Sequence, residues 1–280
     1  MSQTENLDGS AAPLIEHLKE LRNRIMISIV AYMVAFMICY VEWSYVFAFL
    51  SRPMCQALAA RHQECEFVLI KVQEGFFVTL KIAMWGGFVL AFPVIAVQLW
   101  RFIAPGLYKN EKMAFLPFLF ASPIMFCLGG AFAYLVVLPF AFDFFLSYQD
   151  SFKGAMQSAN SLAQVPHGVV FQGSVEAFFA LTMQFLMAFG LCFQLPVLLT
   201  LMGKAGLIGS KGLKSTRKYA VVGIMILSSM IAPPDVTSMM ILFAVIYPLY
   251  EVSIWIIVYF EKQAEKQAKL DGTWEEPEDE

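Results

Sequence analysis

Six stretches of this 280-residue chain carry almost no charged side chain, and they constrain its fold more than any other feature. A helix that crosses the roughly 30 Å hydrocarbon core of a membrane needs about 20 predominantly apolar residues. Hydrophobic residues make up 59% of the sequence and charged residues 15%, and this balance is not that of a soluble globular domain. The sequence therefore predicts an all-α integral membrane protein with six transmembrane helices, over residues 25–41, 76–100, 113–142, 177–203, 219–234 and 236–260.

The distribution of positive charge predicts how these spans are oriented. Short segments rich in Lys and Arg stay on the cytoplasmic side of a membrane. Fourteen of the 19 Lys and Arg residues lie in the N-terminal segment 1–24, in the connections 101–112 and 204–218, and in the C-terminal segment 261–280. We therefore expect both termini in the cytoplasm, the last segment forming a solvated acidic tail.

The two longest connections, residues 42–75 and 143–176, then lie outside and predict an external cap. The first mixes apolar residues with charges, which is typical of short interfacial helices. Cys55 and Cys65 both lie there, and in an oxidising compartment they could form a disulfide or remain two free thiols. Six prolines predict kinked spans, because each removes a backbone hydrogen bond: Pro93, Pro117, Pro123, Pro139, Pro196 and Pro248.

Several classes of function find no support in the sequence. The net charge is -3, so no basic surface for nucleic acid is expected. The five cysteines lack CxxC spacing, so we predict neither a metal site nor a cofactor.

Residues 13–25 read as an amphipathic helix that runs into the first span, because Leu and Ile recur there at spacings of four, three and four. Glu20 and Arg24 are four residues apart, the spacing of a helical ion pair. In the short cytoplasmic connection that follows the second span, Glu111 falls in the first turn of the third helix, where the helix dipole favours an acid.

Residues 16–24, EHLKELRNR, resemble the EHLxELRxR signature of the TatC family, the polytopic receptor subunits of the twin-arginine protein translocase. Further segments fit the same family in order. These are Phe76-Phe77, Lys81, Pro93, Gln98, the string FIAPGLYKNE at 102–111, AFAY at 131–134 and PPDV at 233–236.

The resemblance implies a function and its site. In this family the glutamates that correspond to Glu20 and Glu111 hold the arginine pair of a signal peptide. Two further residues, Phe102 and Leu107, would contact apolar parts of the signal, while the side chains of Arg22 and Arg24 would orient the two carboxylates.

The resemblance also implies partners and a location. The partners would be twin-arginine signal peptides of folded proteins, single-span TatA and TatB type subunits, membrane lipid and further copies of this chain. The proton-motive force would drive export across the bacterial cytoplasmic (inner) membrane, with no enzymatic step.

Polar residues within or beside the spans are a second set of candidates, because such groups are costly in lipid and contact partner helices or water. They are Gln98, Glu176, Gln184 and Gln194. Many members of the family carry Glu where this chain has Gln194. Gln keeps the hydrogen bonding but loses the titratable charge, which favours a plain hydrogen bond between helices.

Two other functions remain open on the residues alone. A small-molecule secondary transporter would show repeated halves and a site at the bilayer midplane, and spans one to three show no similarity to spans four to six. A passive scaffold would tolerate neutralisation of Glu20 and Glu111. The fifth span, with 16 residues, is short for a full crossing, which indicates either local thinning of the bilayer or a sheltered hairpin with the sixth.

Overall fold

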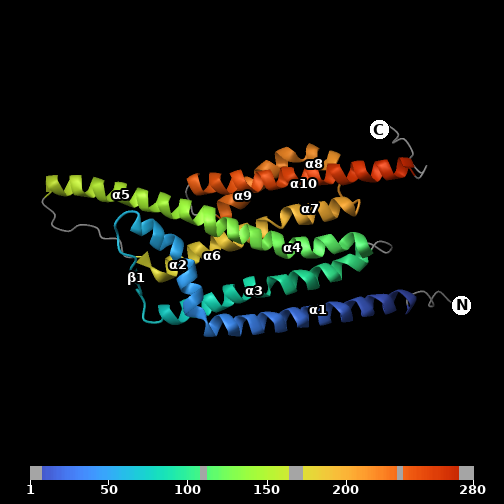
Figure 1. Cartoon of the computed structure of the whole chain (residues 1–280), viewed down its shortest axis with the longest axis horizontal. Coiled ribbons are helices and arrows are strands. Elements are labelled where there is room, and N and C mark those ends of the chain that lie inside the picture. Colours follow the sequence, from blue (N-terminus) through green and yellow to red (C-terminus); the bar gives the residue numbers. More distant parts are fainter. Residues whose placement is uncertain (1–7, 108–111, 164–172, 232–235, 271–280) are drawn as a thin grey trace. The chain divides into compact units, whose positions relative to one another are not determined.

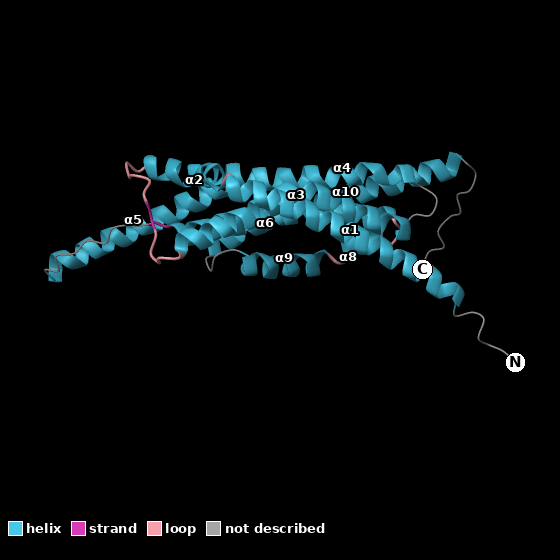
Figure 2. Ribbon diagram, turned by 90° about the horizontal axis from the view of Figure 1, so that it is seen from below, coloured by secondary structure: helices cyan, strands magenta, loops and turns pink. Residues whose placement is uncertain are grey.

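The computed structural model describes residues 8–107, 112–163, 173–231 and 236–270, and these residues are mostly helical (Figure 1). In chain order the elements are α1 (Asp8–Val41), α2 (Trp43–Ala59), β1 (Phe67–Val68), α3 (Glu74–Leu107), α4 (Lys112–Phe132), the π-helical turn η1 (Ala133–Val137), α5 (Leu138–Ala163), β2 (Gly173–Ser174), α6 (Val175–Cys192), α7 (Leu195–Lys204), α8 (Ser210–Ser215), α9 (Arg217–Ile231) and α10 (Val236–Leu270). Figure 2 shows how small the strand content of the described chain is.

Five helical stretches in the described ranges are long and apolar enough to cross a membrane: His17–Val41, Glu74–Phe102, Pro117–Phe152, Val175–Lys204 and Met239–Gln263. The remaining predicted span, the fifth along the chain, corresponds to α9, which has 15 residues and a length of about 22 Å at 1.5 Å per residue. It is shorter than the roughly 30 Å hydrocarbon core. The end of this predicted span, residues 232–234, lies outside the described residues.

Large apolar side chains cover much of the surface of these helices. On α1, Val30, Val34 and Met37 are each more than half exposed. Exposure of whole apolar faces is typical of a surface solvated by lipid, because hydrocarbon tails impose no penalty on such side chains. The chain is accordingly a predominantly helical integral membrane protein.

As the sequence predicted, the amphipathic segment and the first span form one continuous helix, α1. Other helix boundaries differ from the predicted spans: α3 continues to Leu107, and the helix of the third span continues through η1 as far as Ala163. A turn at Phe193 and Gln194 separates α6 from α7. The predicted acidic tail begins as helix, since α10 continues to Leu270 through residues with high helix propensity.

The described chain divides into two compact units. The first contains α1, α2, α3, η1, α5, the strands and adjoining parts of α4 and α6. Helices α1 and α3 pack along each other (Figure 1), and they approach closely at Gly87. A Cβ atom there would lie 2.8 Å from the Cα atom of Phe36. Small residues at such crossings allow two backbones to meet.

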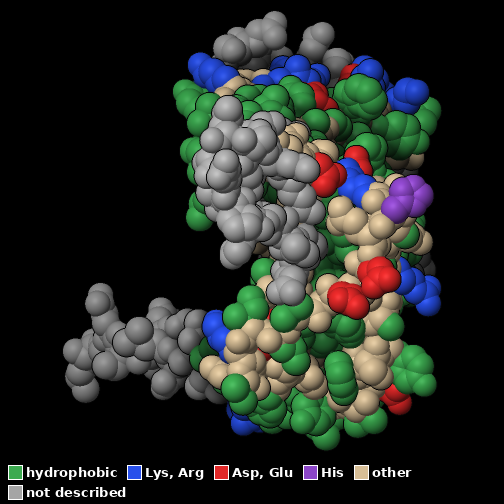
Figure 3. Space-filling model, turned by 90° about the vertical axis from the view of Figure 1, so that its left-hand side faces the viewer, with side chains coloured by type: hydrophobic (Ala, Val, Ile, Leu, Met, Phe, Trp, Pro, Cys, Tyr) green, Lys and Arg blue, Asp and Glu red, His purple; other side chains and the backbone are tan. Residues whose placement is uncertain are grey.

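The segment between α2 and α3 folds back onto the first unit. Helix α2 packs against α5 and α3, while β1 pairs in parallel with β2, Phe67 opposite Gly173. We use the name cap from here on for α2, for residues 60–73, which include β1, and for β2. Residues 143–163, which the sequence also assigned to an external cap, belong to α5. Acidic and basic side chains lie beside one another on the end of the molecule that carries the cap, among hydrophobic and other side chains (Figure 3).

The second unit contains α7, α8, α9 and α10 with the adjoining end of α6. Helix α10 packs on α7 and α9, and Ile246, Ile254 and Ile257 of α10 are buried. Arg217 at the start of α9 forms a 2.7 Å ion pair with Glu251 of α10. This contact ties one end of the short helix to its long neighbour.

Candidate functional site

A polar cluster joins α1 to α3. Arg24 bridges the two helices: its Nη2 donates to Oε1 of Glu20 at 3.0 Å, and its Nη1 donates to Oε1 of Gln98 at 3.0 Å. The ion pair follows from the helix itself, since residues four apart lie on one face. The bond to Gln98 needs the packing of α1 on α3. One guanidinium therefore orients a carboxylate of α1 and an amide of α3 together.

The carboxylate of Glu20 remains accessible in this arrangement. Its side chain is 36% exposed, against 25% for Arg24. Arg24 engages Oε1, and within the described ranges Oε2 has no hydrogen-bond partner. A carboxylate accepts hydrogen bonds at both oxygens. The site can thus accept a further cationic donor while the first oxygen stays held.

Aromatic rings flank this cluster. The rings of His17 in α1 and Phe102 in α3 stack with centroids 4.4 Å apart and planes 15° apart, so that the two helices are held together at this point. Favourable ring contacts stabilise a pair by about 0.5 to 1.5 kcal/mol beyond its buried area. The stack fixes an apolar surface beside the carboxylate.

A groove of about 390 Å³ runs between the same two helices, and Arg24, Gln98 and Phe102 form part of its lining. Its remaining walls are largely apolar: Leu21, Ile25, Ile29, Ile95 and Leu99 contribute to them. The polar cluster and an apolar surface therefore lie side by side along this groove.

Four of the residues singled out by the sequence lie together in this cluster, namely Glu20, Arg24, Gln98 and Phe102. Gln98, which the sequence places among the polar residues expected to contact a partner helix or water, accepts from Arg24 of α1. Arg22 is exposed on α1. Glu111 lies outside the described residues, and α3 ends at Leu107, whose side chain is not described.

A second polar cluster lies at the other end of α3 and centres on Glu74, whose exposed fraction is 2%. Its Oε2 accepts from the backbone N–H groups of Ile70 and Lys71, at 2.6 and 3.1 Å. Its Oε1 accepts from the N–H of Glu176 at 3.0 Å and from the hydroxyl of Ser174 at 3.2 Å. The Glu74 carboxylate therefore binds the segment that follows β1 and the segment where β2 ends and α6 begins.

The remaining polar candidates occupy separate places. The carboxylate of Glu176 forms ion pairs with Lys81 at 2.7 Å and with Lys71 at 3.6 Å. The side chain of Gln184 is exposed on α6, and Gln194 lies in the turn between α6 and α7.

Two members of these clusters, His17 and Glu74, are not among the site residues that the sequence predicts. His17 is three residues before Glu20, and that helical spacing could have indicated a shared face. Glu74 carried no such signal, because its partners are defined by the pairing of distant segments. Within the described ranges no group of three His, Cys, Asp or Glu side chains is placed to hold a metal ion.

The fold and the cluster together define a polytopic membrane protein that presents an accessible acidic and aromatic site where two of its spanning helices meet. The chain belongs to the TatC family of Sec-independent protein translocase proteins, whose family model matches residues 16–244.

Known relatives resemble the chain over nearly its whole length. The Sec-independent protein translocase protein TatC of Magnetococcus marinus is 38% identical over 96% of this chain and 93% of its own length. The TatC protein of Aquifex aeolicus is 36% identical over 87% and 94%, and that of Escherichia coli 32% over 89% and 89%. A crystal structure of the twin-arginine translocase receptor TatC in DDM superimposes with a TM-score of 0.71 at 34% identity, covering 86% of this chain and 98% of that one.

Proposed function

We propose that this chain is the membrane receptor and core subunit of a twin-arginine translocase, and that it binds the signal peptides of folded proteins at Glu20. The observation that carries the proposal is the half-engaged carboxylate of Glu20, which Arg24 orients through a single oxygen. The family assignment agrees with this function and does not favour a small-molecule transporter.

The chemistry of the cluster suits arginine better than lysine. A guanidinium is planar and presents several donors in a fixed fork, and charge-assisted hydrogen bonds to a carboxylate are about twice as strong as neutral ones. The guanidinium of Arg24 already binds one oxygen of the Glu20 carboxylate. An incoming arginine would bind Oε2, and the second arginine of the pair would use Glu111, which the family resemblance assigns to the same site.

The apolar part of a signal peptide requires an apolar surface beside the carboxylate. Phe102 stacks on His17, and Phe102 also lines the groove between α1 and α3. Leu107 would add to the same surface. Arg22, exposed two residues after Glu20, would help to orient the two carboxylates or anchor this end of the helix at the membrane surface.

The wider role follows from the family. We propose that the chain acts without an enzymatic step in the bacterial cytoplasmic (inner) membrane, with both termini cytoplasmic, and that it recruits single-span TatA and TatB type subunits for export driven by the proton-motive force. The excess of Lys and Arg in the segments at one side supports this orientation. The exposed polar side chain of Gln184 and the turn at Gln194 are candidate contacts for those subunits.

The test is binding of a twin-arginine signal peptide, with a twin-lysine peptide for comparison, to the full chain in lipid nanodiscs. Removal of a hydrogen bond to a charged group costs about 1.5 to 3 kcal/mol. We therefore expect Glu20→Gln to weaken binding of the arginine peptide by roughly 10- to 100-fold, and Glu111→Gln to act in the same direction.

Glu66→Gln is the matched control, because Glu66 is an exposed acid in the cap. It should leave peptide affinity unchanged. Equal affinity for the arginine and lysine peptides, or equal affinity of wild type and Glu20→Gln, would show that this cluster is not the signal site.

A further inference from the structure

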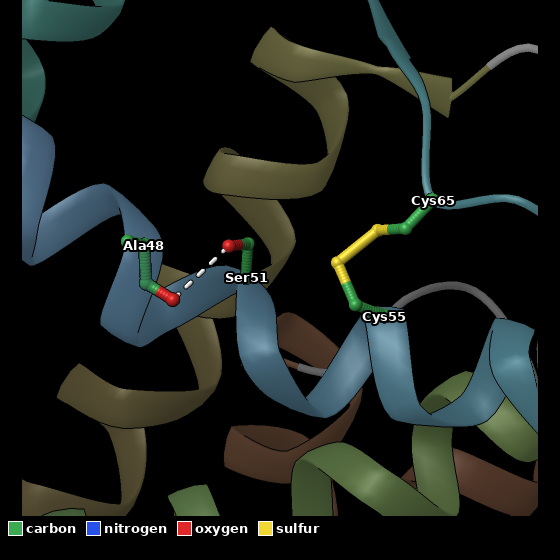
Figure 4. The surroundings of a disulfide bond; sticks show 4 residues. All are labelled: Ala48, Ser51, Cys55 and Cys65. Carbon is green, nitrogen blue, oxygen red and sulfur yellow. Dashed lines mark hydrogen bonds between the residues drawn. A yellow bond between two sulfur atoms is a disulfide. The ribbon is translucent and has the colours of Figure 1, made fainter.

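One covalent bond closes the cap. Cys55 in α2 and Cys65, two residues before β1, form a disulfide across a Cα–Cα distance of 5.1 Å (Figure 4). The other three cysteines, Cys39, Cys127 and Cys192, are free thiols. Both bonded cysteines are half-buried. The bond settles the alternative that the sequence left open.

The loop that the disulfide closes carries an ionic attachment of the cap to α5. Nη1 of Arg61 lies 2.7 Å from Oδ1 of Asp143, and its Nε donates to Oδ2 of Asp150 at 3.2 Å. Its Nη2 also donates to the carbonyl oxygen of Asp143 at 3.0 Å. With 17% of its side chain exposed, Arg61 binds two carboxylates of α5. Closing the loop therefore restricts where this guanidinium can lie.

The strand that follows the loop cannot hold itself in place. β1 has two residues, and a ladder this short is unstable without support from elsewhere. Its support is apolar: the ring of Phe67 packs against Phe47 at 5.7 Å and against Phe178 at 4.9 Å between centroids. Cys65 precedes Phe67 by two residues. The disulfide thus anchors the entry to β1, while Glu74 binds the backbone on its exit.

We propose that Cys55 and Cys65 are a substrate of a protein-thiol oxidant on the external side of the membrane, and that this oxidation is the covalent step that completes the cap. Disulfides persist in oxidising compartments and are rare in the cytosol. A bond in residues 42–75 requires this segment to face the compartment that holds the oxidant. The inference does not depend on signal-peptide binding.

The chemistry balances by thiol–disulfide exchange. One thiolate of the pair attacks a reducible disulfide of the oxidant protein and forms a mixed disulfide, which releases one thiol of the oxidant. The second cysteine attacks the mixed disulfide and releases the other. The pair loses two protons and two electrons, and the disulfide of the oxidant becomes two thiols. The partner is therefore a protein with an exposed, reactive dithiol–disulfide couple.

Counting thiols in the full chain tests this step directly. Cells are quenched with acid, the membranes are dissolved in detergent, and free thiols are labelled with a maleimide polymer that shifts the band once per cysteine. We expect three labels before reduction and five after it, as the free thiols require. In cells whose external dithiol oxidase is inactivated, we expect five labels before reduction. Five labels in normal cells, or three in the oxidase-deficient cells, would overturn the proposal.

The role of the bond in the cap has its own measurement, hydrogen exchange of the purified chain in nanodiscs. The bond spans a sequence separation of 10, and the entropy of closing such a loop corresponds to roughly 100-fold in local opening. We expect the amides of residues 66–71 to exchange 10- to 100-fold faster, on this scale, in Cys55→Ser with Cys65→Ser.

The matched control is Cys127→Ser, since Cys127 is an exposed free thiol of α4. It should leave exchange in the cap unchanged. Wild type treated with a reductant provides the same comparison without a substitution. Exchange that is equal in oxidised and reduced protein would show that the disulfide does not hold the cap.

Discussion

The crossing of α1 and α3 at Gly87 supports a sharp prediction for Gly87→Ala. A Cβ atom at this position would lie 2.8 Å from the Cα atom and 2.9 Å from the backbone nitrogen of Phe36. These are backbone atoms, so no side-chain rotation relieves the contact. Helix α3 must move away from α1 by several tenths of an ångström, or the helix must bend.

Two opposing effects set the change in the free energy of unfolding. Overpacking of a well-packed interface costs about 1 to 3 kcal/mol, whereas replacing Gly by Ala inside a helix gains up to about 1 kcal/mol. The control is Gly130→Ala in α4, because a Cβ atom at Gly130 has no atom within 4 Å. It keeps the propensity gain without the clash. We therefore expect Gly87→Ala to be less stable than Gly130→Ala by about 1 to 3 kcal/mol.

Thermal unfolding of both variants in the same nanodiscs measures this difference. The substitution also separates Arg24 from Gln98, whose bond crosses the same helix pair, so affinity for the twin-arginine peptide should fall in Gly87→Ala alone. If the Gly87→Ala protein were as stable as Gly130→Ala, the two backbones would not approach closely at Gly87.

Two further substitutions probe the polar clusters. Gln98→Leu removes the second acceptor of Arg24 and should reduce discrimination of arginine from lysine peptides by about tenfold, the worth of a hydrogen bond to a charged group. Gln98→Glu, which keeps an acceptor, should restore it, and equal discrimination in both variants would exclude Gln98 from orienting the site. Lys81→Met leaves Glu176 without its nearest cation, which lies at 2.7 Å, and should lower the unfolding temperature. Lys71→Met is the matched control, because Lys71 is more exposed and lies at 3.6 Å; a larger effect at Lys71 would contradict this ranking.

Several features of the chain could be predicted because they are written locally along it. Uncharged apolar runs indicated the membrane-spanning helices, and the i, i+4 spacing of Glu20 and Arg24 indicated their ion pair, which the structure confirms at 3.0 Å. The motifs around residues 16–24 and 102–111 indicated the family, which the comparisons confirm. The pairing of Glu20 with Glu111 stays a prediction.

Only the tertiary structure decided which distant residues meet. Gln98 bonds Arg24 across 74 positions, and Glu74 accepts from the backbone of Glu176 across 102; neither pairing leaves a periodic trace, because it depends on how helices cross and not on local spacing. The same holds for the closure of the α2–β1 loop by Cys55 and Cys65, where composition allowed both states and geometry selected one. Hydropathy and helical periodicity are properties of a single segment, so the sequence by itself determined which segments are helices and that they lie in a membrane. The hydrogen-bond partner of each polar side chain depends on how distant segments pack, so only the tertiary structure determined it.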